Sequence, residues 1–260
     1  MDERRPVDRN WLAVSSLAVF AAVVTALLAV VSLGLLTAGL GATLAAVAVG
    51  GVGITAADRL SAAWAEHRPY VWFSVGLFAV GGLLGAALLA AGVDLTELFL
   101  ELLEEEFAAD EESPDDELEI DISATFFVFQ NTPPFLLSIF GVLTLGLLTF
   151  LVMFVNGVLV GNVALSVAGT VGVDFVLVGL APHGIFELPA LFVAAGVGFR
   201  LLHRLVQRVV GSREAFVTRE YLVQTGTLVL FAWLLLVVAA FVEAYLTPTL
   251  LEALFSARLE

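Results

Sequence analysis

Long runs of apolar residues, separated by short polar links, dominate the pattern along this chain. The first run continues from residue 11 to residue 57, and about 20 apolar residues are enough for a helix to cross a bilayer. This run therefore predicts two membrane helices, at about 11–33 and 40–57, joined by a turn at its glycines. It is also far longer than the apolar core of a cleavable signal peptide.

The later apolar runs predict five further spans, at about 70–93, 135–155, 159–181, 182–202 and 221–245. The stretch 169–182 is ambiguous because Gly172 and Asp174 interrupt a short apolar segment, and such segments often re-enter the membrane instead of crossing it. The pattern predicts an all-α, polytopic integral membrane helical bundle with about seven transmembrane helices, one of which either spans or re-enters.

The composition excludes an ordinary soluble domain. Hydrophobic residues make up 60% of the chain and charged residues only 14%, whereas a soluble domain carries about 25% charged residues. A net charge of −15 repels phosphate backbones, so we expect no nucleic-acid partner. Cysteine is absent, which excludes disulfides, a thiolate nucleophile and a zinc site built on sulfur. The use of arginine without lysine, together with acidic loops, is typical of a salt-adapted organism.

The arginines predict the orientation of the chain. Cytoplasmic loops are enriched in Lys and Arg. Ten of the 11 arginines fall in the N-terminal segment or in the links after the second and sixth predicted helices, and the exception, Arg258, lies in the C-terminal tail. We therefore expect a multi-pass protein of the cell membrane with a cytoplasmic N-terminus and a C-terminus outside.

The predicted outer link between the third and fourth spans is strongly acidic, with 14 of the 26 acidic residues between positions 94 and 121. Apolar residues recur at helical spacing over 95–103, which predicts a helix along the membrane surface. Acids dominate 110–121, which predicts disorder. Divalent-cation binding and simple solvation of the loop would both explain the acids, and the absence of a calcium-loop pattern favours solvation.

Polar residues at membrane depth are costly, so they are candidates for function by default. The candidates are Asn131, Asn156, Asp174, His183 and Glu187. Close helix contacts are indicated separately by Gly157 and Gly161, which are four residues apart, because small residues let membrane helices approach one another.

Three hypotheses apply to His183 and Glu187. Pro182 lacks an N–H and is expected to begin a helix, so the two side chains, one turn apart, would share a face near its start. A charge-assisted hydrogen bond that fixes the helix start and its packing partner is the favoured hypothesis, and a proton or ion pathway is the second. A metal site lacks ligands, because His67 and His203 fall on the predicted cytoplasmic side and no His-Glu-x-x-His element is present. We therefore expect no metal, no cofactor and no catalytic residue.

Several elements, in this order, resemble the stage II sporulation protein M family. Three aromatic residues lead to Asn131, and an Asn-Gly-x-x-x-Gly element follows at 156–161. A Pro-His-Gly-x-x-Glu element then comprises Pro182, His183, Gly184 and Glu187, and a glycine-bearing helix follows it. The resemblance covers about 70–260. The first two helices have no counterpart in it, and the prolines at 133–134 depart from the family pattern.

This resemblance divides the chain into an N-terminal transmembrane hairpin with a cytoplasmic link, residues 1–69, and a family-like membrane domain, residues 70–260, with its acidic outer loop at 94–124. It implies a polytopic, non-enzymatic membrane protein. In spore-forming bacteria the family member holds cell-wall hydrolases at the membrane in an engulfment complex. Archaeal relatives occur where neither spores nor peptidoglycan exist, so sporulation itself is not carried over.

Two functions follow from these observations. The first is a scaffold or component of a cell-envelope complex, embedded in the lipid bilayer, with protein partners or further copies of the chain. The alternative is a small transporter in which Asn156, Asp174, His183 and Glu187 line a path. An intramembrane hydrolase lacks a serine-nucleophile motif or a metal set. A transporter requires its polar residues to converge on a water-accessible cavity, whereas a scaffold packs them against neighbouring helices.

Overall fold

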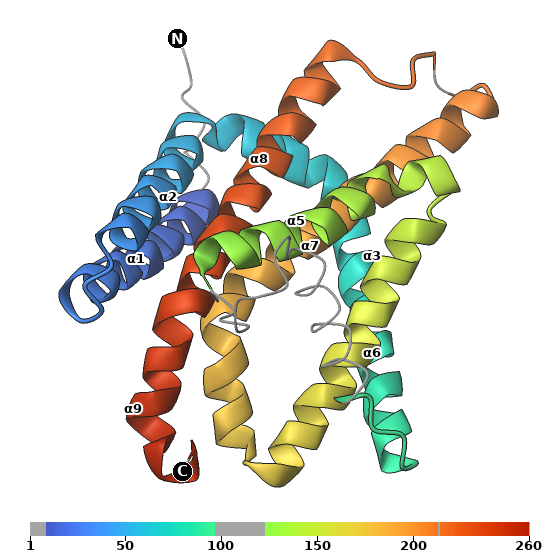
Figure 1. Ribbon diagram of the computed structural model, residues 1–260. Helices are drawn as coiled ribbons and strands as arrows, with labels where there is room; N and C mark the ends of the chain where they lie inside the picture. Colours follow the sequence, from blue (N-terminus) through green and yellow to red (C-terminus); the bar gives the residue numbers. More distant parts are fainter. Residues whose placement is uncertain (1–8, 97–122, 213, 260) are drawn as a thin grey trace, which may run out of the picture.

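The computed structural model describes residues 9–96, 123–212 and 214–259, and over these residues the chain forms helices and no strand (Figure 1). The elements are α1 (Arg9–Val31), α2 (Leu36–Thr55), α3 (Ala57–Ala90), α5 (Ala124–Phe140), the 3-10 helix η1 (Gly141–Thr144), α6 (Leu147–Thr170), α7 (Val173–Val209), α8 (Arg219–Phe241), the π-helix η2 (Val242–Leu246) and α9 (Thr247–Leu259). Most of the acidic segment, with its expected surface helix and disordered link, lies outside the described residues.

Seven segments of the described chain are long and apolar enough to cross a membrane: Asn10–Val31, Leu36–Thr55, Ala57–Ala90, Ala124–Thr144, Leu147–Thr170, Val173–Val209 and Arg219–Arg258. The all-α bundle of about seven transmembrane helices is confirmed. The chain is a multi-pass membrane protein. Its boundaries, however, differ from those expected from hydropathy.

The expected span 135–155 is wrong, because the chain reverses in the middle of that apolar run. Leu145 and Gly146 adopt left-handed backbone conformations, with φ of 54° and 85°, and they separate η1 from α6. The run contains no charged residue at this turn, so its hydropathy does not mark the break. The preceding helix α5 begins at Ala124, so the aromatic stretch expected to lead into a span is itself part of a helix.

The expected helix start at Pro182 is also wrong. The break lies at Gly172, whose φ of 119° no other residue adopts without strain, and α7 continues from Val173 through Pro182 and Pro189 to Val209. Its 37 residues extend about 55 Å at 1.5 Å per residue. The spanning and the re-entrant alternatives for the stretch 169–182 both require a helix to end near residue 182. Instead, this stretch contains the α6–α7 turn, and helix α7 then continues past residue 182.

The polar link expected at 58–69 is helical as well and forms the first part of α3. Figure 1 shows α3 lying across one end of the bundle and then turning down along α6. Pro69 lies inside this helix, and a proline removes a backbone hydrogen bond and bends the helix around it. The bend carries the charged residues before Pro69 over the end of the bundle.

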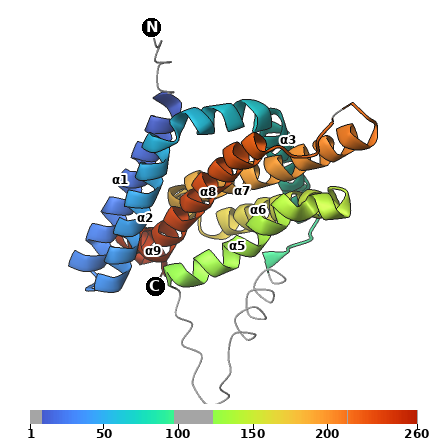
Figure 2. The same ribbon diagram turned by 90° about the horizontal axis from the view of Figure 1, so that it is seen from above.

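The most buried spans are α7 and the continuous α8–η2–α9 rod. Figure 2 shows α8 in the middle of the bundle, with the α1–α2 hairpin on one side and α5 on the other. Phe231 of α8, Phe135 of α5 and Val197 of α7 are fully buried between these helices. Large apolar side chains remain exposed on the outer faces, as on Leu44 of α2 and Leu83 of α3, where a bilayer surrounds such a protein.

Glycines bring α3 and α6 into backbone contact. A Cβ atom on Gly157 would collide with the carbonyl oxygen of Phe78, and one on Gly161 would collide with that of Gly82. In the opposite direction, a Cβ on Gly85 would collide with the carbonyl oxygen of Val158. The close helix contact expected from the spacing of Gly157 and Gly161 is therefore present, and its partner helix is α3.

Candidate functional site

Two acids and a histidine gather in the interior of the bundle. His183 and Glu187 lie one turn apart on one face of α7, and Glu243 approaches them from the π-helix η2. One ligand atom of each residue lies within 4.8 Å of those of the other two. His183 is only 8% exposed, whereas Glu187 and Glu243 are half-buried, so the surrounding helices cover the cluster in part.

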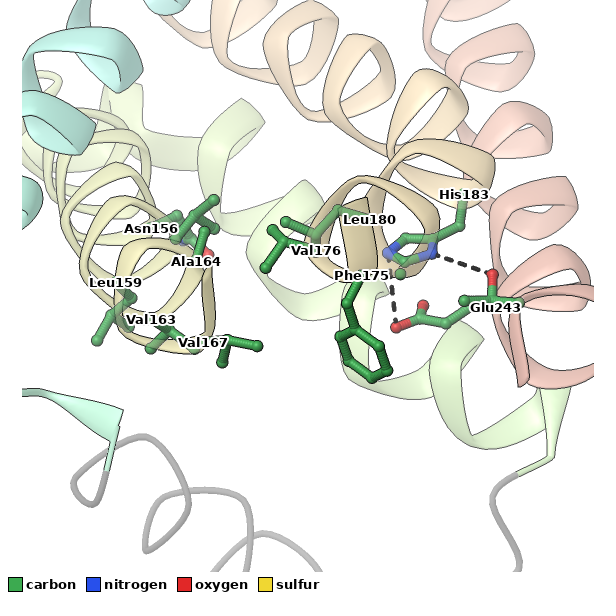
Figure 3. A pocket seen from close by; sticks show the side chains of 13 residues that line it. Asn156, Leu159, Val163, Ala164, Val167, Phe175, Val176, Leu180, His183 and Glu243 are labelled. Carbon is green, nitrogen blue, oxygen red and sulfur yellow. Dashed lines mark hydrogen bonds and ion pairs between the residues drawn. The ribbon is translucent and has the colours of Figure 1, made fainter. Parts of the chain in front are cut away.

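The two nitrogens of His183 face different partners. Its Nε2 lies 3.9 Å from Glu243 Oε1, and its Nδ1 lies 3.5 Å from Thr247 Oγ1. Figure 3 shows the imidazole ring of His183 directed towards Glu243. These partners come from η2 and α9, so the histidine ties α7 to the C-terminal rod and does not fix a helix start.

One carboxylate oxygen in this cluster is unsatisfied. Glu243 Oε2 is buried and accepts no hydrogen bond from the described part of the chain. Buried polar atoms almost always have a partner, so such an exception requires an explanation. Glu243 is not among the residues expected from the sequence, because this acid stands alone near the end of the last apolar run.

A cavity of about 380 Å³ adjoins the cluster. Figure 3 shows side chains of α6 on one side of it, and His183 and Glu243 on the other. Its polar lining comes from Asn156, His183, Glu243 and Thr247, and most of the remaining wall is aliphatic. Asn156 donates from Nδ2 to the carbonyl oxygen of Val152, 2.7 Å away on its own helix.

Asp174 does not join this site. It is an exposed residue in the first turn of α7, and its Oδ1 accepts a hydrogen bond of 3.0 Å from Arg258 Nη1. The same nitrogen donates to the carbonyl oxygen of Val171 at 3.0 Å. Asp174 therefore fastens the α6–α7 turn to the end of α9 at the surface of the bundle.

The remaining candidates lie apart from the cavity lining. Asn131 is half-buried within α5, and Gly184 lies inside α7 with open space where a Cβ would be. Pro182 precedes His183 in the interior of α7. The structure thus brings His183 and Glu187 together and places Asn156 across the cavity from His183.

A second polar cluster, absent from the sequence-based expectations, joins α3 to α7. Glu66 Oε1 accepts hydrogen bonds from Arg200 Nη2 at 2.7 Å and from Arg204 Nη1 at 2.8 Å. Arg204 is 3% exposed, stacks over the Tyr221 ring at 3.7 Å and donates from Nε to the carbonyl oxygen of Phe216. The i, i+4 spacing of the two arginines was the available signal for a shared acidic partner.

Asn162 forms a third polar contact that sequence reasoning missed. Its Nδ2 donates to the carbonyl oxygens of Gly85 at 3.0 Å and Val93 at 2.9 Å, and its Oδ1 accepts from the Leu95 amide at 2.7 Å. The side chain is fully buried. One amide thus binds a carbonyl inside α3 and both a carbonyl and an amide of the segment that follows it.

Asp94 adds to this contact outside the membrane-spanning helices. Hydrogen bonds from Thr96 and Ser166 hold the pKa of the Asp94 carboxyl below its ordinary value, because they favour the charged form. The bond from Ser166 Oγ to Asp94 Oδ2 is 2.8 Å long. The segment after α3 is therefore tied to α6 by both side chains.

A known protein family matches the part of the chain that contains this site. The sequence profile of the family described as stage II sporulation protein M matches residues 74–248. The chain belongs to the stage II sporulation protein M family. An uncharacterized protein of Methanocaldococcus jannaschii is 31% identical over 122 residues, which cover 45% of this chain and 67% of that relative. No solved structure matches.

The region that matches the stage II sporulation protein M family contains the site. It begins inside α3 and ends just after the start of α9, so His183, Glu187 and Glu243 all fall within it. The α1–α2 hairpin and Glu66 lie before it. The family resemblance identified from the residue pattern is confirmed, and the matched region includes the cavity.

Proposed function

We propose that this stage II sporulation protein M family member is a membrane scaffold, a non-enzymatic component of a cell-envelope complex. The observation that carries the proposal is that polar side chains inside the bundle bind neighbouring helices. Asn162 binds three backbone groups of α3 and the segment that follows it, and Glu66 binds two arginines of α7. Interhelical bonds of this kind hold a fixed arrangement of helices, which is what an assembly platform requires.

The residues assigned to a transport path support the same proposal. Asp174 lies at the surface with Arg258, and Asn156 is bonded to its own helix. Of the four path residues, only Asn156 and His183 line the cavity. A continuous polar route across the bundle would need more of them, so a transporter is the less favoured function.

The orientation is part of the proposal. Figure 1 shows the α2–α3 junction and the α7–α8 link at one end of the bundle, and the α6–α7 turn and the end of α9 at the other. The first end carries Arg59, Arg68, Arg200, Arg204, Arg208 and Arg219, and the second carries Arg258. By the positive-inside rule, the first end is cytoplasmic and the C-terminus is outside.

Photo-crosslinking in native membranes tests the scaffold. A photoreactive residue at Leu44, which is 70% exposed on α2, reaches whatever lies against the bundle, whereas one at the fully buried Leu60 is a matched control. A scaffold gives a defined crosslink to an envelope protein from position 44 and none from position 60. Crosslinks to lipid alone, together with ion flux through proteoliposomes of the purified chain, would contradict the scaffold and indicate a transporter.

A further inference from the structure

We propose that His183, Glu187 and Glu243 bind a divalent first-row transition-metal ion in the interior of the bundle. The three ligand atoms lie within 4.8 Å of one another. A tetrahedral ion about 2.0–2.2 Å from each ligand atom holds those atoms about 3.3–3.6 Å apart. The 3.9 Å between His183 Nε2 and Glu243 Oε1 is slightly longer than this, so a bound ion draws the three side chains closer together.

Charge favours a cation at this position. Glu187 and Glu243 face each other at membrane depth, where like charges repel and an unpaired carboxylate is costly. The ion-paired arginines of the described chain are bound to Glu66 or Asp174, and the sequence contains no lysine. A dication compensates both carboxylates, and the buried Glu243 Oε2 would become a ligand or accept a hydrogen bond from metal-bound water.

The histidine is oriented as a metal ligand. Metal-bound histidines usually donate their other N–H to a second partner, which fixes the tautomer and the ring. Thr247 Oγ1 lies beside Nδ1, whereas Nε2 faces Glu243. Donation from Nδ1 to Thr247 therefore leaves the Nε2 lone pair directed towards Glu243.

The backbone around Glu243 is specialised in the same way. Glu243 lies in η2, a single π-helical turn between α8 and α9. A π-helical turn is rare within an α-helix and is frequent at functional sites. Here it interrupts the longest buried rod of the bundle at the residue that supplies the third ligand.

The ligand set selects the class of ion. One imidazole with two carboxylates suits Mn²⁺, Fe²⁺, Co²⁺ or Zn²⁺, whereas Mg²⁺ and Ca²⁺ prefer oxygen alone and Cu⁺ prefers sulfur. Three protein ligands leave a coordination position open, as in reactive zinc sites. The adjoining cavity of about 380 Å³ has room for water or a small oxygen ligand at that position.

Cobalt titration of the purified full-length chain tests the site. The chelator-treated protein is titrated with Co²⁺ in excess Mg²⁺, which occupies the exposed acids, and the visible absorption of ligand-bound cobalt is recorded. We expect one equivalent to bind and to be displaced by Zn²⁺. His183→Ala, Glu187→Gln and Glu243→Gln should each weaken binding at least about tenfold, and Thr247→Val should weaken it by about tenfold through the ring orientation.

Glu252→Gln is the matched control, because Glu252 is an exposed acid of α9 outside the cluster. Its affinity for Co²⁺ should equal that of the wild type. Circular dichroism of each variant establishes that it is folded, and the conservative Thr247→Val and Glu187→Gln variants remain informative should His183→Ala unfold. A wild-type chain that binds no more Co²⁺ than Glu243→Gln, or variants that bind it as tightly as the wild type, would overturn the proposal.

Discussion

Glu66 of α3 and Arg204 of α7 form an ion pair of 2.8 Å across 138 residues of chain. The pair closes the bent first part of α3 onto the end of α7. Arg204 has a side chain that is only 3% exposed, so its charge depends on Glu66 and on the Tyr221 ring for compensation.

Removal of Glu66 should destabilise this end of the bundle. Glu66→Ala leaves Arg200 and Arg204 without their shared carboxylate, and loss of one partner of a buried ion pair costs about 3 kcal/mol. We expect a clearly lower Tm in detergent. Glu220→Gln, which changes an exposed acid of α8, should leave the Tm unchanged, and equal Tm values for both variants would contradict the structural role of the pair.

Any side chain at position 157 should weaken the α3–α6 contact. Gly157→Ala places a methyl group against the Phe78 carbonyl, and overpacking of this kind costs about 1–3 kcal/mol. Gly169→Ala is the matched change on the same helix, at a position with open space, and it should preserve or raise the Tm because alanine favours the helix. The reverse order of the two Tm values would contradict this packing.

Asn162 should control the opening of the segment that follows α3. Asn162→Leu leaves the Leu95 amide and two carbonyls without their partner, at a cost of about 1–3 kcal/mol for each group that stays buried. Hydrogen exchange at Leu95 should become faster. Asn156→Leu removes only a bond within α6, so exchange at Leu95 should not respond to it.

Protonation of Asp94 should weaken the same contact. The pKa of its carboxyl in the folded chain lies below the ordinary value of 3.8, so the stabilisation is present above that value and is lost as the pH falls through the folded pKa. The Tm difference between wild type and Asp94→Asn should therefore be present at neutral pH and disappear in strong acid. A difference that grows as the pH falls would reverse the assigned sign.

Thiol labelling should determine the orientation, since the chain has no cysteine. Ser212→Cys and Ala91→Cys place exposed thiols in the α7–α8 link and after α3, at opposite ends of the bundle. With a cytoplasmic N-terminus, a membrane-impermeant reagent should label position 91 in intact cells and position 212 only after lysis. Labelling of position 212 alone would invert the orientation.

The residue pattern by itself determined the features that contiguous residues encode. Runs of apolar residues predicted an all-α membrane bundle with about seven spans, and the spacing of Gly157 and Gly161 predicted a close helix contact. The helical period likewise placed His183 and Glu187 on one face. Each of these properties depends on local composition and on the geometry of one helix.

Tertiary structure alone decided where the apolar runs break and which residues meet. A turn such as Leu145–Gly146 depends on backbone conformation and packing, and hydropathy does not change across it. The partners of His183 lie on η2 and α9, with Thr247 64 residues away, and Asn162 meets the end of α3 because α6 packs there. Such contacts require knowledge of which helices are neighbours, and in an apolar chain many helix pairings bury their surfaces equally well.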